Sequence, residues 1–487
     1  MYLLKKLVRQ TAVYGLSSIL GRLLNYLLVP LYTTVFASGE YGVLTELYAY
    51  AAFLNILYVY GLETTYFRFS KDGDNIFHVA FTSILVSSLV LSGILWVTSN
   101  SIVMFLDYPE RGDYIRWLAL IVAIDAIVAV PFAKLREDDK VVKFAVFKLS
   151  NTGINILLNL FFIVFCPRVL AKNPEHFLST IYEPELGIGY VFVSNLIANA
   201  LYLIFFIPTW RTVKLKFDSV EWSRMMTYAW PVLIIGFAGV TNEMLSRAML
   251  KHRLPEGFYP EYSNLEILGI FGACYKLSVF MTLAIQAFRY AFEPFFFTKA
   301  RDKNSPRVFS KVMTYFVLFT SFFWLVLCLF MPYYAPVFLR QESYLIALDS
   351  VPWLLGGGMF LGIFYNLSLW YKLTDHTLYG AYISLIGSAS TFFLNWVLIP
   401  TYGYMGSAYT TFFSYLLMVV ISYSWGRKYY PVPYSVLKII GYILLAGIGV
   451  LLNETIGASF LLSIFMILIF LTLAFLTERK SLMQIKF

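Results

Sequence analysis

The sequence predicts an all-α polytopic membrane protein, and three observations carry that prediction. Of the 487 residues, 59% are apolar and only 13% are charged, whereas soluble chains carry about 25% charged residues. Apolar runs of about 20 residues, each able to cross roughly 30 Å of hydrocarbon, recur along the whole chain. The connections between them average about a dozen residues. No folded soluble domain is therefore expected, which excludes most enzymes.

About fourteen transmembrane helices fit the apolar pattern. The first run follows Lys5, Lys6 and Arg9, but it is too long for a signal peptide and contains Arg22, so we expect it to be retained. The predicted spans are residues 11–35, 42–66, 77–98, 114–133, 142–166, 188–208, 226–250, 267–293, 309–330, 345–370, 377–399, 404–425, 434–452 and 457–477.

The distribution of Lys and Arg predicts the orientation. With the N-terminus inside, the inner connections and both tails hold about 24 of these residues and the outer connections about six, a bias typical of the positive-inside rule. We therefore expect a multi-pass protein of the bacterial cytoplasmic (inner) membrane with both termini cytoplasmic. The net charge of +9 is then an orientation signal, and no nucleic acid partner is expected.

A weak internal repeat predicts how the helices are grouped. Residues 41–69 align with 268–296, with Gly42 over Gly269 and Tyr48 over Tyr275. Because six spans separate the copies, the halves would be parallel repeats. We expect two six-helix lobes around a cavity plus two further helices. The predicted divisions are an N-lobe of residues 1–210, a C-lobe of residues 211–430, and helices 13 and 14 with a short cytoplasmic tail in residues 431–487.

Ionisable side chains inside apolar spans are the main chemical clue. Placing one at mid-bilayer costs about 2.5–3.5 kcal/mol of insertion free energy unless water or an opposite charge contacts it. They concentrate in the first eight spans. The predicted substrate-binding cations of the cavity are Arg22, Lys148, Arg247, Lys276 and Arg289, and the candidates for a coupling-ion site are Glu46, Glu63, Asp125 and Glu243.

Structural roles remain open for several of these side chains. Glu243, Arg247 and Lys251 lie four residues apart on one helix face, and Arg289 shares a face with Glu293, so each set could be an intrahelical ion pair. Lys148 is near enough to the inner end of its span to snorkel.

Arg22 has no acidic residue within four positions, and Ser18 and Asn25 continue its face as a polar stripe. This pattern favours a cation that faces the cavity over one paired with another helix.

A cationic cavity favours an anion, and guanidinium groups match phosphate oxygens bidentately. The 37 tyrosines and 45 phenylalanines exceed what interfacial belts need, and rings on the polar helices could stack against sugars, although core packing or interface anchoring also accounts for any single ring. The tyrosines on or near these helices are Tyr14, Tyr26, Tyr48, Tyr275 and Tyr290.

No cofactor is predicted. Cys166, Cys274 and Cys328 show neither Cys-x-x-Cys nor Cys/His spacing, so neither a metal site nor a disulfide framework is expected. No phosphate-binding Gly-x-x-x-x-Gly-Lys-Ser/Thr loop occurs. Energy for transport would then come from a gradient of H⁺ or Na⁺, or from consumption of the product.

A set of short motifs marks the first seventy residues. They are Tyr14-Gly15, Arg22, Pro30-Leu31-Tyr32-Thr33, Glu40-Tyr41-Gly42, Gly61-Leu62 and Tyr66-Phe67-Arg68-Phe69. These motifs resemble the polysaccharide transporter branch of the multidrug/oligosaccharidyl-lipid/polysaccharide exporter superfamily, which includes the O-antigen (Wzx-type) flippases of lipopolysaccharide synthesis. Thr34 stands where this branch often has a basic residue, so the resemblance assigns no cation there.

The resemblance implies a flippase rather than an enzyme. It would move an undecaprenyl-pyrophosphate-linked oligosaccharide from the inner to the outer leaflet by alternating access, with the lipid tail left in the bilayer. Its partners would be that substrate, membrane lipids and the polysaccharide polymerase and chain-length machinery, and we expect a monomer.

Three other functions remain as alternatives. A cation-coupled multidrug antiporter of the same fold would need a more acidic cavity. A lipid II flippase shares the size and the cationic cavity. A membrane-embedded glycosyltransferase or polymerase would need catalytic groups on a large outer loop, and the outer loops hold no paired catalytic motif.

Overall fold

The computed structural model confirms a multi-pass helical membrane protein. It describes residues 19–73, 75–108, 111–299, 304–457 and 459–482, and this part of the chain contains no β-strand. Twelve helices are long and apolar enough to cross a membrane, and Ile19–Val35 and Gly189–Phe205 are shorter apolar helices. Together they correspond to the fourteen predicted spans. Tyr14, Gly15 and Ser18 lie outside the described residues.

The chain divides into two compact units, Met1–Ala248 and Met249–Phe487. The boundary falls within α11 (Ser219–Arg253). The divisions after residues 210 and 430, and the cavity between two lobes, stay predictions.

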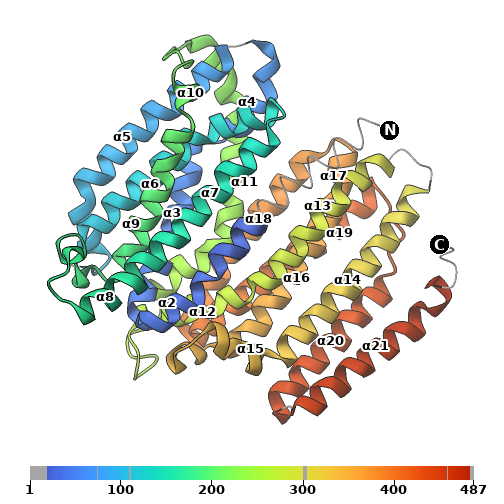
Figure 1. Cartoon of the computed structure of the whole chain (residues 1–487). Helices are drawn as coiled ribbons and strands as arrows, with labels where there is room; N and C mark the ends of the chain where they lie inside the picture. The colour runs from blue at the N-terminus through green and yellow to red at the C-terminus, as the bar shows by residue number, and fades with distance from the viewer. Residues whose placement is uncertain (1–18, 74, 109–110, 300–303, 458, 483–487) are drawn as a thin grey trace. The chain divides into compact units, whose positions relative to one another are not determined.

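In the first unit, residues 19–26 are helical and the longer helices form a bundle in which α6 packs against α3, α5 and α9, and α7 packs against α9. Figure 1 shows these helices side by side. Their bounds are α2 (Leu28–Val35), α3 (Ser38–Val59), α4 (Leu62–Phe69), α5 (Asn75–Phe105), α6 (Gly112–Glu137), α7 (Val141–Leu160), α8 (Cys166–Lys172), α9 (Gly189–Phe205) and α10 (Ile207–Trp210), with 3₁₀ turns at Ser70–Asp72, Phe177–Thr180 and Pro184–Leu186.

The second predicted span is broken in the structure. Tyr60 and Gly61 both take left-handed backbone conformations, with φ of 33° and 77°, and they separate α3 from α4. A Cβ atom at Gly61 would lie 2.8 Å from the carbonyl oxygen of Ala229 on α11. Only glycine allows this close approach together with a positive φ.

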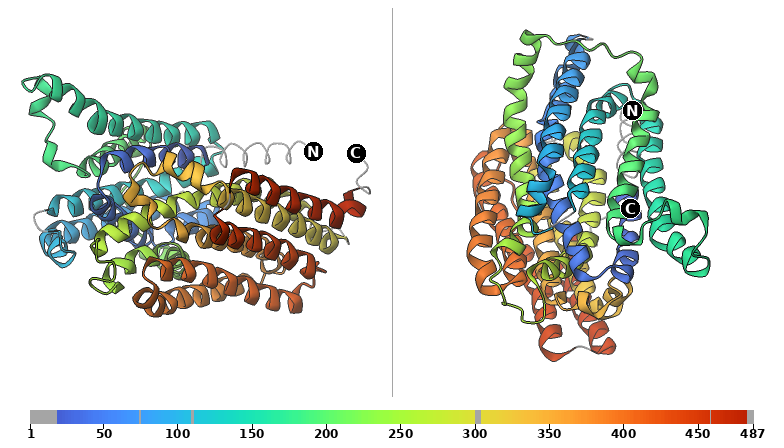
Figure 2. Two further views of the ribbon diagram at one scale, coloured as in Figure 1. Left: turned by 90° about the horizontal axis from the view of Figure 1, so that it is seen from below. Right: turned by 90° about the vertical axis from the view of Figure 1, so that its left-hand side faces the viewer.

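A π-helical turn, Phe161–Phe165, joins α7 to α8. Such turns are rare and widen the helix by one residue. The segment that follows α8 lies at one end of the helices of this unit (Figure 2).

In the second unit, α16 packs against α14 and α19, and α14 also packs against α20. Glycines on α16 permit this spacing, since a Cβ atom at Gly356 would lie 2.8 Å from the Phe412 ring. The bounds are α12 (Asn264–Leu277), α13 (Val279–Lys299), α14 (Ser305–Leu329), α15 (Met331–Phe338), α16 (Val351–Leu367), α17 (Leu369–Leu373), α18 (Thr377–Tyr402), α19 (Tyr404–Tyr429), α20 (Val436–Ile456) and α21 (Phe460–Leu482), with 3₁₀ turns at Glu342–Leu345 and Leu348–Ser350.

Candidate functional site: a polar network and an apolar cavity

A stripe of amides runs along α7 in the first unit. Asn151, Asn155 and Asn159 are spaced four residues apart, so they lie on one face of the helix. Asn159 is fully buried and its side chain donates to the Asn155 main-chain carbonyl at 2.8 Å. Unpaired amides are costly in an apolar interior, so this face requires polar partners.

Those partners come from α6 and α9. The Asn151 side chain donates to the Asn199 carbonyl oxygen at 2.9 Å, and the Asn199 amide donates to the Asp125 carboxylate at 3.1 Å. One turn earlier on α9, Asn195 donates to the Tyr48 hydroxyl at 2.6 Å. The network therefore gathers groups from four helices around a single carboxylate.

Lys148 supplies the cation of this network. Its ammonium group lies 4.3 Å from the centre of the Phe132 ring and 5.3 Å from that of Tyr202, and it interacts electrostatically with Asp125. Aromatic faces stabilise a cation that has left water. The sequence predicts Lys148 as a substrate-binding cation and Asp125 as a candidate for the coupling-ion site. In the structure, both side chains belong to the same network.

The network extends to the first apolar helix. Tyr32 donates to the Asn159 side-chain oxygen at 2.8 Å, and Asn155 donates to Asn25 at 3.5 Å. Arg22, one turn before Asn25, is exposed. Its predicted role in substrate binding stays a prediction.

Glu46 lies elsewhere in the first unit, where the hydroxyl groups of two tyrosines contact its carboxylate. The carboxylate is fully buried and accepts hydrogen bonds from Tyr50 at 2.9 Å and from Tyr108. Tyr108 belongs to the connection between α5 and α6. Burial and the nearby Glu46 carboxylate raise the pKa of Tyr108, so this phenol remains a donor.

Glu63 forms an ion pair with Arg136 at the C-terminal end of α6, and the neighbouring Tyr66 donates to Glu137. Both contacts tie α4 to α6. This geometry gives Glu63 a structural role, while its role in ion coupling stays a prediction.

On α11, Glu243 and Arg247 meet through the main chain. The Arg247 guanidinium donates to the Glu243 carbonyl oxygen at 2.8 Å. The Glu243 side chain is exposed, whereas Arg247 and Lys251 are buried. This contact is thus not the carboxylate–guanidinium pair that the spacing allows.

In the second unit, the guanidinium of Arg289 on α13 lies 4.2 Å from the centre of the Tyr365 ring. It borders a small pocket that Tyr365, Asn366 and Lys372 also line. Lys276 is half-buried in the last turn of α12. The structure does not describe the side chain of Glu293, so the predicted pair with Arg289 stays untested.

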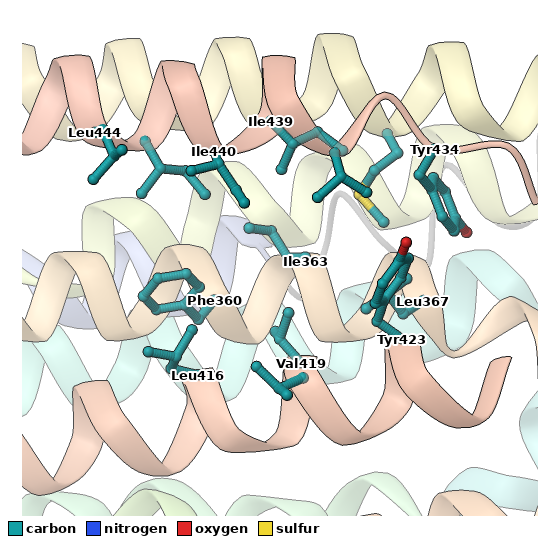
Figure 3. Close-up of a pocket in the computed structure, with 14 residues that line it drawn as sticks. Phe360, Ile363, Leu367, Leu416, Val419, Tyr423, Tyr434, Ile439, Ile440 and Leu444 are labelled. Atoms are coloured by element: carbon teal, nitrogen blue, oxygen red, sulfur yellow. The ribbon is translucent and has the colours of Figure 1, made fainter. Parts of the chain in front are cut away.

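An apolar cavity of about 330 Å³ lies beside α16 in the same unit. Figure 3 shows Phe360 and Ile363 of α16 facing it together with Ile440 of α20. Two tyrosines, Tyr423 and Tyr434, are its only lining side chains with a polar atom other than the Met313 sulfur. No charged group lines it, so it suits a hydrocarbon chain. The full lining is Met313, Phe360, Ile363, Leu367, Leu416, Val419, Val420, Tyr423, Tyr434, Val436, Ile439, Ile440, Ile443 and Leu444.

The fold matches solved transporters along nearly the whole chain. The lipid II flippase MurJ in an inward closed conformation has a TM-score of 0.71 and 13% identity, covering 97% of this chain and 100% of its own. An inward-facing MATE family multidrug transporter of the MOP superfamily has a TM-score of 0.61 and 12% identity, covering 87% and 95%. The chain shares the fold of these two proteins.

Other comparisons refine this placement. A Vibrio cholerae MATE transporter, VcmN, has a TM-score of 0.58 and 14% identity, covering 88% of this chain and 97% of its own. Residues 36–171 match the family of polysaccharide biosynthesis proteins. No curated protein matches the sequence. The predicted resemblance to the polysaccharide transporter branch is confirmed, and the solved proteins that share the fold are a flippase and transporters.

Sequence reasoning missed the amides. The sequence shows the four-residue spacing of Asn151, Asn155 and Asn159, and of Asn195 and Asn199, within two apolar spans. Because these side chains are neutral, a search for ionisable residues does not select them. Sequence reasoning also missed Lys372, which lies two residues beyond the predicted span 345–370 and, in the structure, on the short helix α17. No cluster that could hold a metal ion occurs among the described residues, and Cys166, Cys274 and Cys328 are buried free thiols.

Proposed function

We propose that this protein is a flippase for an undecaprenyl-pyrophosphate-linked oligosaccharide, such as an O-antigen repeat unit, and moves it from the inner to the outer leaflet by alternating access. The observation that carries the proposal is the two-sided character of α16. One side, with Phe360, Ile363 and Leu367, borders the apolar cavity, and another, with Tyr365 and Asn366, borders the pocket of Arg289. An amphiphile with a hydrocarbon tail and an anionic head needs both.

The chemistry of each pocket fits one part of that substrate. The apolar lining is as compatible with a prenyl chain as the surrounding lipid tails, so the chain meets no polar barrier there. The guanidinium of Arg289 and the ammonium of Lys372 favour phosphate oxygens. The match of residues 36–171 to polysaccharide biosynthesis proteins favours a glycan over a drug as the cargo.

We extend the proposal to the energy source. Among the four candidate carboxylates, Asp125 is best placed to couple transport to H⁺ or Na⁺, because it is held by Asn199 and interacts with the charge of Lys148. Glu46 and Glu63 are engaged by phenols and by Arg136 respectively. Arg22, Arg247 and Lys276 are proposed to contact the glycan or its pyrophosphate.

The proposal also covers the setting of the protein. It would work as a monomer in the bacterial inner membrane, with both termini cytoplasmic, beside the polymerase and chain-length proteins that consume its product.

A lipid II flippase is the second candidate, favoured by the TM-score of 0.71 with a protein of that title. It would use the same two pockets, because lipid II is also a prenyl pyrophosphate.

Reconstitution into liposomes tests these functions. A fluorescent prenyl-pyrophosphate oligosaccharide, fluorescent lipid II and a cationic dye are compared, with an impermeant reductant reporting the outer-leaflet lipid. We expect faster translocation of the oligosaccharide than in protein-free liposomes. Transport of the dye alone would overturn the proposal in favour of drug efflux, and lipid II alone would select the second candidate.

A further inference from the structure

A second cavity, of about 180 Å³, lies in the first unit between the start of α3 and the segment that follows α8. It is separate from the polar network and from the apolar cavity. Its walls are four aromatic rings, several aliphatic groups and one carboxylate, from Val35, Phe36, Glu40, Phe162, Ile163, Pro167, Tyr182, Pro184, Gly187 and Tyr190.

Three of these rings, those of Phe162, Tyr190 and Tyr182, form a continuous stack. Tyr190 lies between Phe162, at 4.8 Å and 15°, and Tyr182, at 4.9 Å and 7°. The π-helical turn carries Phe162, and Tyr190 is fixed because its hydroxyl accepts a hydrogen bond from the Glu183 amide at 2.6 Å. Tyr182 ends the stack, and its other face meets no further ring among the described residues.

One carboxylate, that of Glu40, lines the same cavity. Glu40 caps the start of α3, where its Oε2 atom accepts from the Ala37 amide at 3.1 Å. Its Oε1 atom would lie 2.8 Å from a Cβ atom at Gly187, a residue with φ of 50°. A side chain at position 187 would therefore crowd the carboxylate, and glycine keeps it accessible.

We propose that this cavity binds one neutral sugar ring of the glycan. A volume of 180 Å³ is below the roughly 300–1,000 Å³ of drug-sized pockets, so it suits a single ring. Sugar C–H groups would pack on the open face of Tyr182, and sugar hydroxyls would donate to Glu40 Oε1.

An interfacial aromatic belt does not account for this arrangement. Belt residues turn their rings to lipid and their polar tips to water, whereas Tyr190 is only 4% exposed and a carboxylate faces the same cavity. The carboxylate also repels an acidic sugar, which restricts the site to neutral ones.

The inference rests on the proposed glycan transport for its biological sense. The loop charges predict that the segment after α8 faces outwards, so the site would receive a sugar on the side of release.

Saturation-transfer NMR on the full-length protein in detergent tests the site without any transport step. The probes are glucose, galactose, N-acetylglucosamine and glucuronic acid. We expect signals from at least one neutral sugar and a weaker signal from glucuronic acid. Tyr182→Ala should lower the neutral-sugar signal by about threefold or more, because it removes the stacking face. Tyr182→Phe keeps the ring and should retain most of it.

Phe177→Ala is the matched control. Phe177 lies in the same segment, is 68% exposed and does not line the cavity, so its loss should leave the signal unchanged. If Tyr182→Ala does not fold, Glu40→Gln decides, because Gln also caps at this position but lacks the charge, and should weaken binding.

Absence of signal from every neutral sugar, or equal signals from wild type and from the folded Tyr182 and Glu40 variants, would overturn the site. Failure of the proposed function would appear only in the liposome experiment, with sugar binding intact, so the two failures are distinguishable.

Discussion

The interiors of the two units differ in chemistry although both are helical bundles. In the first unit, α6, α7 and α9 share a network of amides around Asp125 and Lys148. In the second, α14, α16, α19 and α20 line a cavity that has no charged side chain among the described residues. If the halves descend from one repeat, they have specialised, the first for polar and ionic interactions and the second for hydrocarbon.

The largest expected effect comes from removing the carboxylate of the first unit. Asp125→Ala would leave the Asn199 amide without its acceptor and the Lys148 ammonium without the nearby carboxylate, which should lower the free energy of unfolding by about 3 kcal/mol and abolish transport. Thermal unfolding and the liposome assay measure the two effects. Asp125→Asn with Lys148→Met should recover most of the stability but not the transport. Full transport by this double variant would show that the network is structural only.

Filling the cavity of the second unit should act on the substrate's tail. Ile440→Trp inserts a ring into the cavity, and we expect about a tenfold slower flipping of long-chain prenyl substrates, with little effect on a short-chain analogue. Leu437→Trp is the control, because Leu437 is 89% exposed on the same helix and does not line the cavity. Equal slowing for both chain lengths would contradict a role in tail binding.

The next prediction concerns Arg289, the cation of the proposed head-group site in the second unit. Arg289→Ala should raise the KM for the pyrophosphate-linked substrate about fivefold, since charge-assisted hydrogen bonds to phosphate are lost. Arg289→Lys should reverse only part of this increase in KM, because an ammonium group does not reproduce the bidentate hydrogen bonds of the guanidinium. Initial rates over a range of substrate concentrations give these values. An unchanged KM in Arg289→Ala would remove this residue from the proposed head-group site.

The smallest expected effect concerns the buried carboxylate of Glu46 and one of its two tyrosine donors, Tyr108. Tyr108→Phe removes one donor to Glu46 and should cost about 1–2 kcal/mol of stability at pH 7. The pKa of Tyr108 is raised in the folded protein, above the unfolded value of about 10. Its contribution is therefore complete below pH 10 and is lost as the pH rises above that value. The stability difference between wild type and Tyr108→Phe should shrink above pH 10, and a difference that grows there would refute this assignment.

The helices were predictable because apolar length is set by bilayer thickness, and all fourteen predicted spans correspond to described helices. The break at Tyr60 and Gly61 was not, since a left-handed tyrosine depends on the packing of Gly61 against α11. That break places Glu63 on α4 beside Arg136.

The candidate site was predictable only in part. Asp125 and Lys148 stood out as ionisable groups in apolar spans. Their association depends on how α6 and α7 pack, and the amides that connect them cost less to bury than charges and so attracted less attention.

The π-helical turn at Phe161–Phe165 has a consequence for how related chains align. Each residue of an α-helix advances the chain by about 100°, so one additional residue turns everything beyond it to a different azimuth. An alignment with a relative that lacks this turn needs a one-residue gap within 161–165. With that gap, both the Asn151–Asn159 stripe and Cys166 stay aligned with their counterparts. Such a relative would present a different side chain opposite Tyr190, and at the proposed site this would change its preference among neutral sugars.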